Sequence, residues 1–250
     1  MNAMLFAAGM GKRLKPLTDT MPKALVPVAG KPLVDHVLER LQQAGAERVV
    51  INVHHFAEQI VAHLANHPYR LDIVFSDERD ELLDTGGGLR KAAPLLATPA
   101  DGRPLLLHNV DILSNADLAA FYAAHTADAA ALLVSRRETS RYLLFDDDLR
   151  LRGWLNATTG EVRSPFARLD VGRLHRYAFS GIHCFSPRLF PMMQDFPPRF
   201  SITDFYLSVC DRVPIVAHPA EGLRLLDVGK LNTLEQADAF LQSLGETAQP

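Results

Sequence analysis

Short apolar runs alternate with longer stretches of helical periodicity through the first half of the chain. Hydrophobic residues from Leu33 to Leu41 recur every three or four positions until Gly45, which predicts a helix. A second stretch with this period, from Phe56 to Leu64, predicts another helix. The apolar runs around these helices predict buried strands at residues 4–8, 48–53, 71–75 and 105–107.

The second half of the chain has a different texture. Apolar segments are separated by turn sequences at residues 146–148 and 158–160, which is typical of antiparallel strands. A final helix is predicted at residues 232–244, because its apolar residues fall on one face. The antiparallel strands are predicted at residues 130–135, 142–145, 149–154 and 176–185.

Strands joined by helical crossovers predict a mostly parallel sheet with helices on both faces. The predicted fold class is therefore α/β, a three-layer Rossmann-like arrangement with a mostly parallel mixed sheet and a small β-rich subdomain. No Gly/Ser-rich or Pro-rich linker divides the chain, so we expect one domain over residues 1–250. In such sheets, ligands bind at the carboxyl ends of the strands, where the loop at 9–23 and the residues after Leu107 lie.

Composition narrows the classes of function. The chain has 250 residues, of which 48% are hydrophobic, enough for the core of one large domain. A net charge of −3 gives no basic field, so we expect no nucleic-acid partner. Cys184 and Cys210 lack the spacing of a metal site or disulfide framework and are expected to be buried thiols. With no membrane-length apolar run and no basic leader, we expect a cytoplasmic protein without a membrane partner.

The stretch from residue 6 to residue 28 carries the strongest chemical signal. An apolar strand runs into a turn with Gly9 and Gly11, and Arg13 and Lys23 follow. Without a Cβ, glycines let the backbone turn tightly and aim its N–H groups at anionic oxygens. The two cations can reach the same anion, the arginine as a planar fork and the lysine as a point charge. The stretch therefore predicts a polyphosphate site.

Other glycine-loop motifs do not fit this stretch. A dinucleotide fingerprint needs a third glycine where the chain has Leu14. A Walker A loop needs Lys followed by Ser or Thr after its last glycine, whereas Gly11 and Lys12 are followed by Arg13. The remaining alternative is a plain turn with solvated cations. The prolines within residues 16–27 argue against it, because they stiffen the loop that would surround a ligand.

Residues 9–28 resemble the signature of the sugar-1-phosphate nucleotidylyltransferases, glycine-x-glycine-x-arginine-leucine-x-proline-leucine-threonine followed by proline-lysine-x-leucine-x-proline-valine. The resemblance implies an enzyme that transfers a nucleotidyl group from a nucleoside triphosphate to a sugar 1-phosphate and releases pyrophosphate. It implies a nucleotide-diphospho-sugar transferase fold, with the nucleotide-binding half at about 1–125, the sugar-binding half at about 126–250 and no β-helix extension. In this interpretation Arg13 holds the departing phosphates, and Lys23 stabilises the charge that passes through the α-phosphate.

A second motif, residues 108–111, directly follows the apolar strand at 105–107. Transfer at an α-phosphorus brings anions together, so a divalent cation is needed, and Asp111 offers the hard oxygen ligand that Mg²⁺ prefers. The resemblance supplies a second ligand, Asp227, in the late aspartate-valine-glycine of the family. For each aspartate the alternative is a helix-capping or turn residue.

The resemblance also implies which residues contact the nucleotide. The segment at Thr85, Gly86 and Gly87 resembles the family's threonine-glycine-glycine loop, which we expect to lie against the nucleobase. A flexible surface turn is the alternative. The other predicted nucleotide-binding residues are Ala8, Gly9, Gly11 and Asn109.

The acceptor site is less well defined. Residues 179–185 resemble the family's glycine-isoleucine strand beneath the sugar, so we expect Gly181 to allow close approach of the ring. Relatives often carry a glutamate-lysine pair for the sugar phosphate, but the nearest segment here ends in the uncharged Asn156, which we predict to bind the sugar. Arg136 and Arg137 are interpreted as a solvated charged edge.

Within the family, the chain most resembles the short members that join UTP to N-acetylmuramate 1-phosphate. Mannose 1-phosphate guanylyltransferases and phosphocholine cytidylyltransferases remain alternatives, as does a non-catalytic regulatory protein that binds nucleotide sugars. The intact set of Arg13, Lys23, Asp111 and Asp227 argues against that last class. The predicted partners are a nucleoside triphosphate and a sugar 1-phosphate, and a homodimer is left open.

Overall fold

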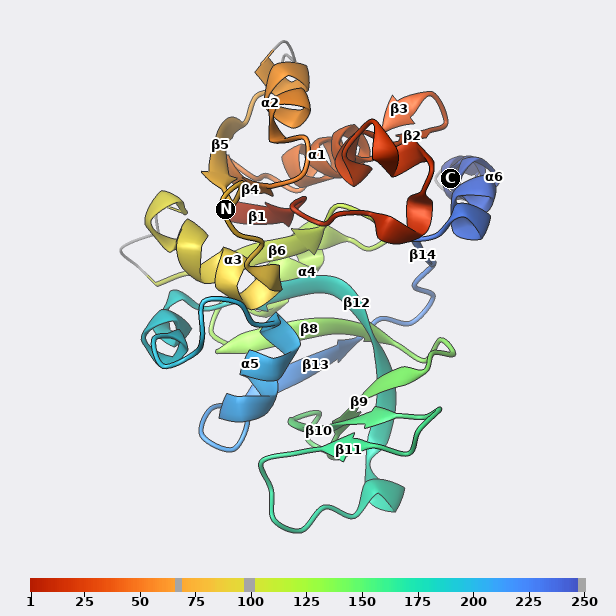
Figure 1. Cartoon of the computed structure of the whole chain (residues 1–250). Coiled ribbons are helices and arrows are strands. Elements are labelled where there is room, and N and C mark those ends of the chain that lie inside the picture. Colours follow the sequence, from red (N-terminus) through yellow and green to blue (C-terminus); the bar gives the residue numbers. More distant parts are fainter. Residues whose placement is uncertain (66–68, 97–101, 247–250) are drawn as a thin grey trace.

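A large mixed sheet runs through the centre of the computed structural model (Figure 1), which describes residues 1–65, 69–96 and 102–246. Strands β5, β4, β1 and β6 are parallel neighbours, and β12 continues the sheet antiparallel to β6. Strand β8 pairs antiparallel with β12, and β13 pairs parallel with β8. The bounds are β1 Asn2–Phe6, β4 Arg48–Val53, β5 Asp72–Asp77, β6 Leu105–Asn109, β8 Ala130–Ser135, β12 His175–Phe185 and β13 Ile215–Pro219.

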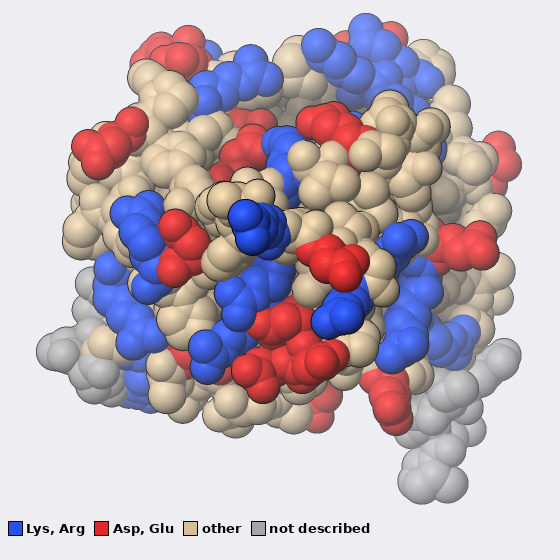
Figure 2. All heavy atoms as spheres, turned by 90° about the horizontal axis from the view of Figure 1, so that it is seen from below, with Lys and Arg blue, Asp and Glu red and all other residues tan. Residues whose placement is uncertain are grey.

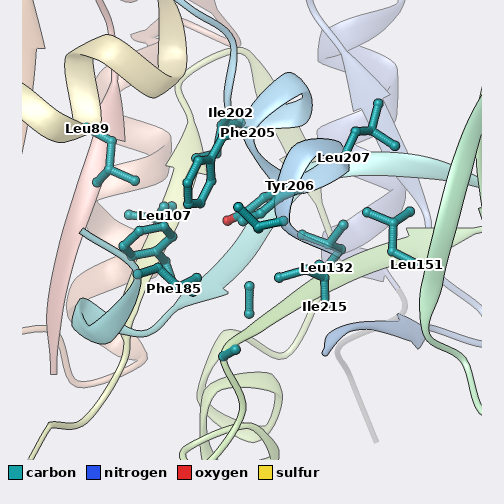
Figure 3. Packing of buried hydrophobic residues seen from close by; sticks show 14 of the residues in the cluster. Leu89, Leu107, Leu132, Leu151, Phe185, Ile202, Phe205, Tyr206, Leu207 and Ile215 are labelled. Carbon is teal, nitrogen blue, oxygen red and sulfur yellow. The ribbon is translucent and has the colours of Figure 1, made fainter. Parts of the chain in front are cut away.

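Alternation along the strands sends apolar side chains to both faces of this sheet. Leu106 belongs to the core shared with α1, α2 and α4, whereas its neighbour Leu107 belongs to the core shared with α3 and α5. Figure 3 shows the second core, where Phe205 of α5 packs near Phe185 of β12. These three layers confirm the predicted fold class. The helices are α1 Leu33–Gln43, α2 Ala57–Ala65, α3 Asp84–Ala92, α4 Leu118–Ala124 and α5 Ile202–Val209.

Strand β12 is shared between the main sheet and a smaller antiparallel one. Residues 182–185 pair with β6, and residues 175–177 pair with β9, so β9, β10 and β11 extend past the carboxyl end of β6. The predicted antiparallel strands are therefore present, but β8 and most of β12 lie in the main sheet. The smaller strands are β9 Arg141–Phe145, β10 Leu151–Asn156 and β11 Val162–Arg163.

The end of the chain returns to the first loop (Figure 1). Strand β14 (Leu225–Asp227) pairs antiparallel with β7 (Ile112–Ser114), which was not predicted. Helix α6 (Leu231–Glu246) confirms the predicted C-terminal helix, and its Ala237 shares a core with Leu14 and Val26. The remaining elements are β2 Pro27–Val28, β3 Lys31–Pro32, η1 Lys12–Leu14, η2 Leu17–Asp19, η3 Lys23–Leu25, η4 Ala93–Leu95, η5 Val171–Arg173 and η6 Pro187–Met193.

The surface carries no extended field of one sign on the face seen in Figure 2, where positive and negative side chains are interspersed. This agrees with the net charge of −3. An anionic ligand on this protein has to be bound by particular side chains and backbone groups. Within the described ranges, every helix is too short or too polar to cross a bilayer.

Candidate active site

A cavity of about 310 Å³ opens at the carboxyl ends of β1, β4 and β6. Residues at each of these strand ends contribute to its wall, as expected for a parallel sheet. The structure therefore brings together motifs that lie far apart in the sequence. Six of the predicted residues line the cavity: Ala8, Gly9, Lys23, Thr85, Asn109 and Asp111.

The two loop glycines have different roles. An added Cβ at Gly9 would meet nothing within 4 Å, and Gly9 lines the cavity. Gly11 has φ 61°, and an added Cβ would lie 2.7 Å from Thr18 Cγ2. The Thr18 hydroxyl donates to the Gly11 carbonyl at 2.9 Å. Gly11 therefore shapes the loop, because only a glycine fits this conformation against Thr18.

Arg13 lies beside Asp227. An added Cβ at Gly229 would fall 2.8 Å from Arg13 Nη2 and 2.6 Å from Asp227 Oδ1, so this glycine lets the two side chains approach the same backbone. Arg13 is exposed and does not line the cavity. Its predicted contact with departing phosphates stays a prediction.

Lys23 forms an ion pair with Asp111 at the wall of the cavity. The lysine is 9% exposed, so this charge is held mostly away from water. A buried cation needs a partner, and Asp111 supplies it in the substrate-free protein. The predicted catalytic cation and a predicted metal ligand are thus in direct contact.

Asp111 and Asp227 are placed next to each other by the β7–β14 pairing. The Val228 amide donates to the Asp111 carbonyl at 2.8 Å, and Asp227 pairs in register with Ile112. Burial raises the pKa of Asp227, and the nearby Asp111 raises it further. Lys23, Arg13 and Arg137 oppose that rise. The two carboxylates therefore repel each other while cations surround them.

The two aspartates fit a magnesium ion. Asp227 Oδ1 is buried without a hydrogen-bond partner among the described residues, which leaves one oxygen for a ligand. Among all the residues that the structure describes, no group of three or more His, Cys, Asp or Glu side chains is arranged to hold a metal ion. Mg²⁺ commonly takes only one or two carboxylates and fills its other positions with phosphate oxygens and water. The donor set therefore suits a metal that binds together with a phosphorylated substrate.

Gly181 lies against Asn109, which lines the cavity. Its φ is 71°, and an added Cβ would fall 2.7 Å from Asn109 Nδ2. The glycine therefore makes room for this amide at the boundary between β6 and β12. Its predicted contact with a sugar ring stays a prediction.

The predicted glycine loop at residues 85–87 is wrong as a loop, because these residues lie in α3. An added Cβ at Gly87 would fall 2.2 Å from the Pro198 carbonyl, and one at Gly86 would fall 2.4 Å from the Phe200 ring. The amides of both glycines donate to the Phe200 carbonyl, at 2.9 and 3.2 Å. The two glycines therefore allow the helix to pack against residues 198–200. Of the three predicted residues 85–87, only Thr85 lines the cavity.

The structure does not bring Asn156 into the cavity. Its side-chain oxygen accepts from the amides of Thr158 and Thr159, at 3.0 and 3.3 Å. The residue therefore stabilises the turn after β10, which is a common use of asparagine.

A buried polar network was missed by the sequence analysis. Asn52 Oδ1 accepts from the amides of Ala7 and Ala8, at 2.7 and 3.3 Å, and its Nδ2 donates to Glu78 Oε1 at 2.7 Å. Glu78 is fully buried, which raises the pKa of its carboxyl, and it also accepts from the Leu83 amide. Both side chains line the cavity. The sequence signal for this network was Asn52, a polar residue within an apolar run.

Three comparisons bear on identity. A model of the nucleotidyl transferase family matches residues 2–147. The chain is 37% identical over 196 residues to N-acetylmuramate alpha-1-phosphate uridylyltransferase of Caulobacter vibrioides. The aligned region covers 75% of this chain and 76% of that protein. It is also 37% identical over 147 residues to mannose-1-phosphate guanyltransferase of Schizosaccharomyces pombe, covering 57% of this chain and 40% of that protein.

Among solved structures, a putative glucose-1-phosphate thymidylyltransferase from Bacillus anthracis aligns with a TM-score of 0.79 over 96% of this chain and 94% of that one. The two are 16% identical, so this likeness establishes the fold alone. The family match spans more than half of the chain and includes the loop cations and Asp111. The chain belongs to the nucleotidyl transferase family.

Proposed function

We propose that this nucleotidyltransferase joins UTP to N-acetylmuramate 1-phosphate, giving UDP-N-acetylmuramate and pyrophosphate. An oxygen of the sugar phosphate forms a bond to the α-phosphorus of UTP. The bond from the α-phosphorus to the bridging oxygen breaks, and pyrophosphate leaves with the electron pair. The observation that carries the proposal is the ion pair of Lys23 and Asp111 on the wall of the cavity, with Asp227 held beside Asp111.

The residues of the site suit this reaction. Mg²⁺ held by Asp111 and Asp227 would neutralise phosphate charge and align the reacting groups. Lys23, which pairs with Asp111, would stabilise the α-phosphate, and the exposed Arg13 would hold the departing phosphates. The acceptor oxygen is already ionised at neutral pH, so no side chain has to remove a proton.

The choice of substrates rests on similarity to the Caulobacter vibrioides enzyme, which extends over 76% of that protein. A second candidate is guanylyl transfer to mannose 1-phosphate, favoured by the Schizosaccharomyces pombe relative. We further propose a cytoplasmic location, supported by Cys184 and Cys210, which are buried free thiols with pKa values raised by burial to about 12 and about 11.

The test is pyrophosphate release over a matrix of four nucleoside triphosphates and several phosphorylated acceptors, with and without Mg²⁺. We expect UTP with N-acetylmuramate 1-phosphate to give the highest kcat/KM. A higher value for GTP with mannose 1-phosphate, or for CTP with phosphocholine, would replace the proposed substrates. Tight nucleotide-sugar binding without turnover in any pair would identify a regulatory protein instead.

A further inference from the structure

Two arginines, Arg136 and Arg137, directly follow strand β8 at the edge of the sheet where the nucleotide cavity opens. Strands β6 and β8 are both antiparallel to β12, so they are parallel to each other and their carboxyl ends share one edge. Asn109 ends β6, and Arg136 directly follows β8. Ile182 of β12 pairs with His108 near the end of β6, whereas Ala178 pairs with Ser135 at the end of β8, so β8 extends past the end of β6 toward the smaller sheet.

The arginines line a second cavity, of about 480 Å³, on the far side of β12 from Asn109. Arg136, Arg137 and Tyr177 form one part of its wall, and residues 219–223 form another. Leu225 also lines it, and Leu225 begins the strand that ends in Asp227. This second cavity therefore adjoins the metal-binding strand on the side away from the nucleotide.

Both arginines are exposed, and their side chains contact neutral partners. Arg137 Nη2 donates to the Phe179 carbonyl at 3.0 Å, and Arg136 Cζ lies 5.6 Å from the centre of the Tyr177 ring. Within the ranges that the structure describes, no carboxylate is in ion-pair distance of either guanidinium. By contrast, Arg152 on β10 pairs with Asp146 at 2.6 Å. The acidic residue on the lining, Glu221, pairs with neither arginine.

These partners hold the side chains in place while leaving guanidinium donors for a ligand. A guanidinium binds carboxylate and phosphate groups through two parallel hydrogen bonds. A neutral sugar has no anionic group that could accept both of them. The charge of Arg137 acts on Asp227 and lowers the pKa of its carboxyl. An acceptor with one anionic group near Asp227 and a second one farther away would match this pair.

Building on the proposed function, we infer that this second cavity binds the acceptor, with Arg137 on its phosphate and Arg136 on a carboxylate carried by the sugar. N-acetylmuramate 1-phosphate has both groups, because its lactyl ether ends in a carboxylate. N-acetylglucosamine 1-phosphate and mannose 1-phosphate have the phosphate alone. Arg136 would then make the protein specific for acidic sugars, and Arg137 would serve every sugar phosphate.

The experiment compares UTP-dependent turnover of N-acetylmuramate 1-phosphate and N-acetylglucosamine 1-phosphate in four proteins: wild type, Arg136→Ala, Arg137→Ala and Arg173→Ala. Arg173 is the matched control, because its side chain is 88% exposed on η5 and pairs locally with Asp170. We expect Arg136→Ala to lower kcat/KM for the acidic sugar about 10- to 100-fold, mainly through KM, and to leave the neutral sugar unchanged. Arg137→Ala should lower both values, and Arg173→Ala neither.

An equal loss for both sugars in Arg136→Ala, or a wild type without preference for the acidic sugar, would overturn the inference. Calorimetric titration of each sugar phosphate into the same proteins, without nucleotide, separates this from the proposed function. If no acceptor is turned over, the proposed function fails. Selective loss of N-acetylmuramate 1-phosphate binding in Arg136→Ala would still support the inference, and unchanged binding would refute it.

Discussion

Lys23 and Asp111 form an ion pair, although one is the expected phosphate-binding cation and the other an expected metal ligand. The pair gives a lysine that is only 9% exposed a partner of opposite charge. A divalent cation at Asp111 would satisfy the carboxylate and leave the ammonium group to bind phosphate. Metal and nucleotide binding are therefore expected to support each other through this contact.

The first prediction concerns Lys23. Replacing it by Ala removes a charge placed at the reacting phosphate, so kcat should fall by a factor of about 100 or more. Lys12→Ala, an exposed change in the same loop, is the control and should change kcat little. Steady-state pyrophosphate release gives the rates, and circular dichroism checks the fold. A Lys23→Ala enzyme of near wild-type activity would remove the residue from the catalytic group.

The second prediction concerns the metal. Asp111→Asn and Asp227→Asn keep the shape of the side chain but lose its charge, so each should raise the Mg²⁺ concentration for half-maximal activity by about tenfold or more. Asp147→Asn, at a side chain that is 93% exposed, serves as the control. Activity is measured against Mg²⁺ concentration at saturating nucleotide. Curves that coincide with wild type in both variants would place the metal elsewhere.

The local signals at strand ends allowed most of the site to be predicted. Glycines and cations after β1 and an aspartate after β6 each mark a carboxyl end, and parallel pairing brings those ends together. The fold class followed from hydrophobic periodicity for the same reason. Asp227 required the family resemblance, because the antiparallel pairing of β14 with β7 joins segments distant in sequence.

The errors arose where long-range packing overrides local preference. Glycine is unfavourable in a helix by about 1 kcal/mol relative to alanine, so residues 85–87 indicated a loop. Their place in α3 depends on contact with residues 198–200, which the local sequence does not encode. Arg136 and Arg137 are exposed, as expected for a charged edge, and only the pairing of β8 with β12 sets where on the sheet they lie.

The third prediction is a dependence of stability on pH that passes through Asp227. Burial and Asp111 raise the pKa of Asp227 in the folded state above the ordinary value of 3.8. At a pH between the ordinary pKa and the raised pKa, the folded state therefore binds more protons than the unfolded state. Ionisation of Asp227 therefore lowers the free energy of unfolding as pH rises from about 4 through the raised pKa. Asp227→Asn removes the buried charge and should raise the free energy of unfolding at pH 7 by roughly 0.5–2 kcal/mol without metal.

Urea unfolding of wild type and Asp227→Asn at pH 4 and pH 7, with a chelator present, measures the effect. The stability gain of the variant should be larger at pH 7 than at pH 4. Added Mg²⁺ should stabilise the wild type more than the variant, because the variant has lost a ligand. A gain that is equal at both pH values would show that Asp227 is not held at an unfavourable charge.

The last prediction tests the packing role of the glycines in α3. A Cβ at Gly87 would fall 2.2 Å from the Pro198 carbonyl, which is backbone and cannot rotate away. Gly87→Ala should therefore lower the free energy of unfolding by about 1–3 kcal/mol, despite the better helix propensity of alanine. Gly245→Ala in α6 is the matched control, because nothing lies within 4 Å of its added Cβ. The free energy of unfolding of Gly245→Ala should be unchanged or higher by up to about 1 kcal/mol. A decrease for Gly87→Ala and an increase for Gly245→Ala in urea unfolding would separate the effect of packing from that of helix propensity. If residues 85–87 instead formed a loop over the nucleobase, Gly87→Ala would weaken UTP binding while leaving the free energy of unfolding near that of wild type.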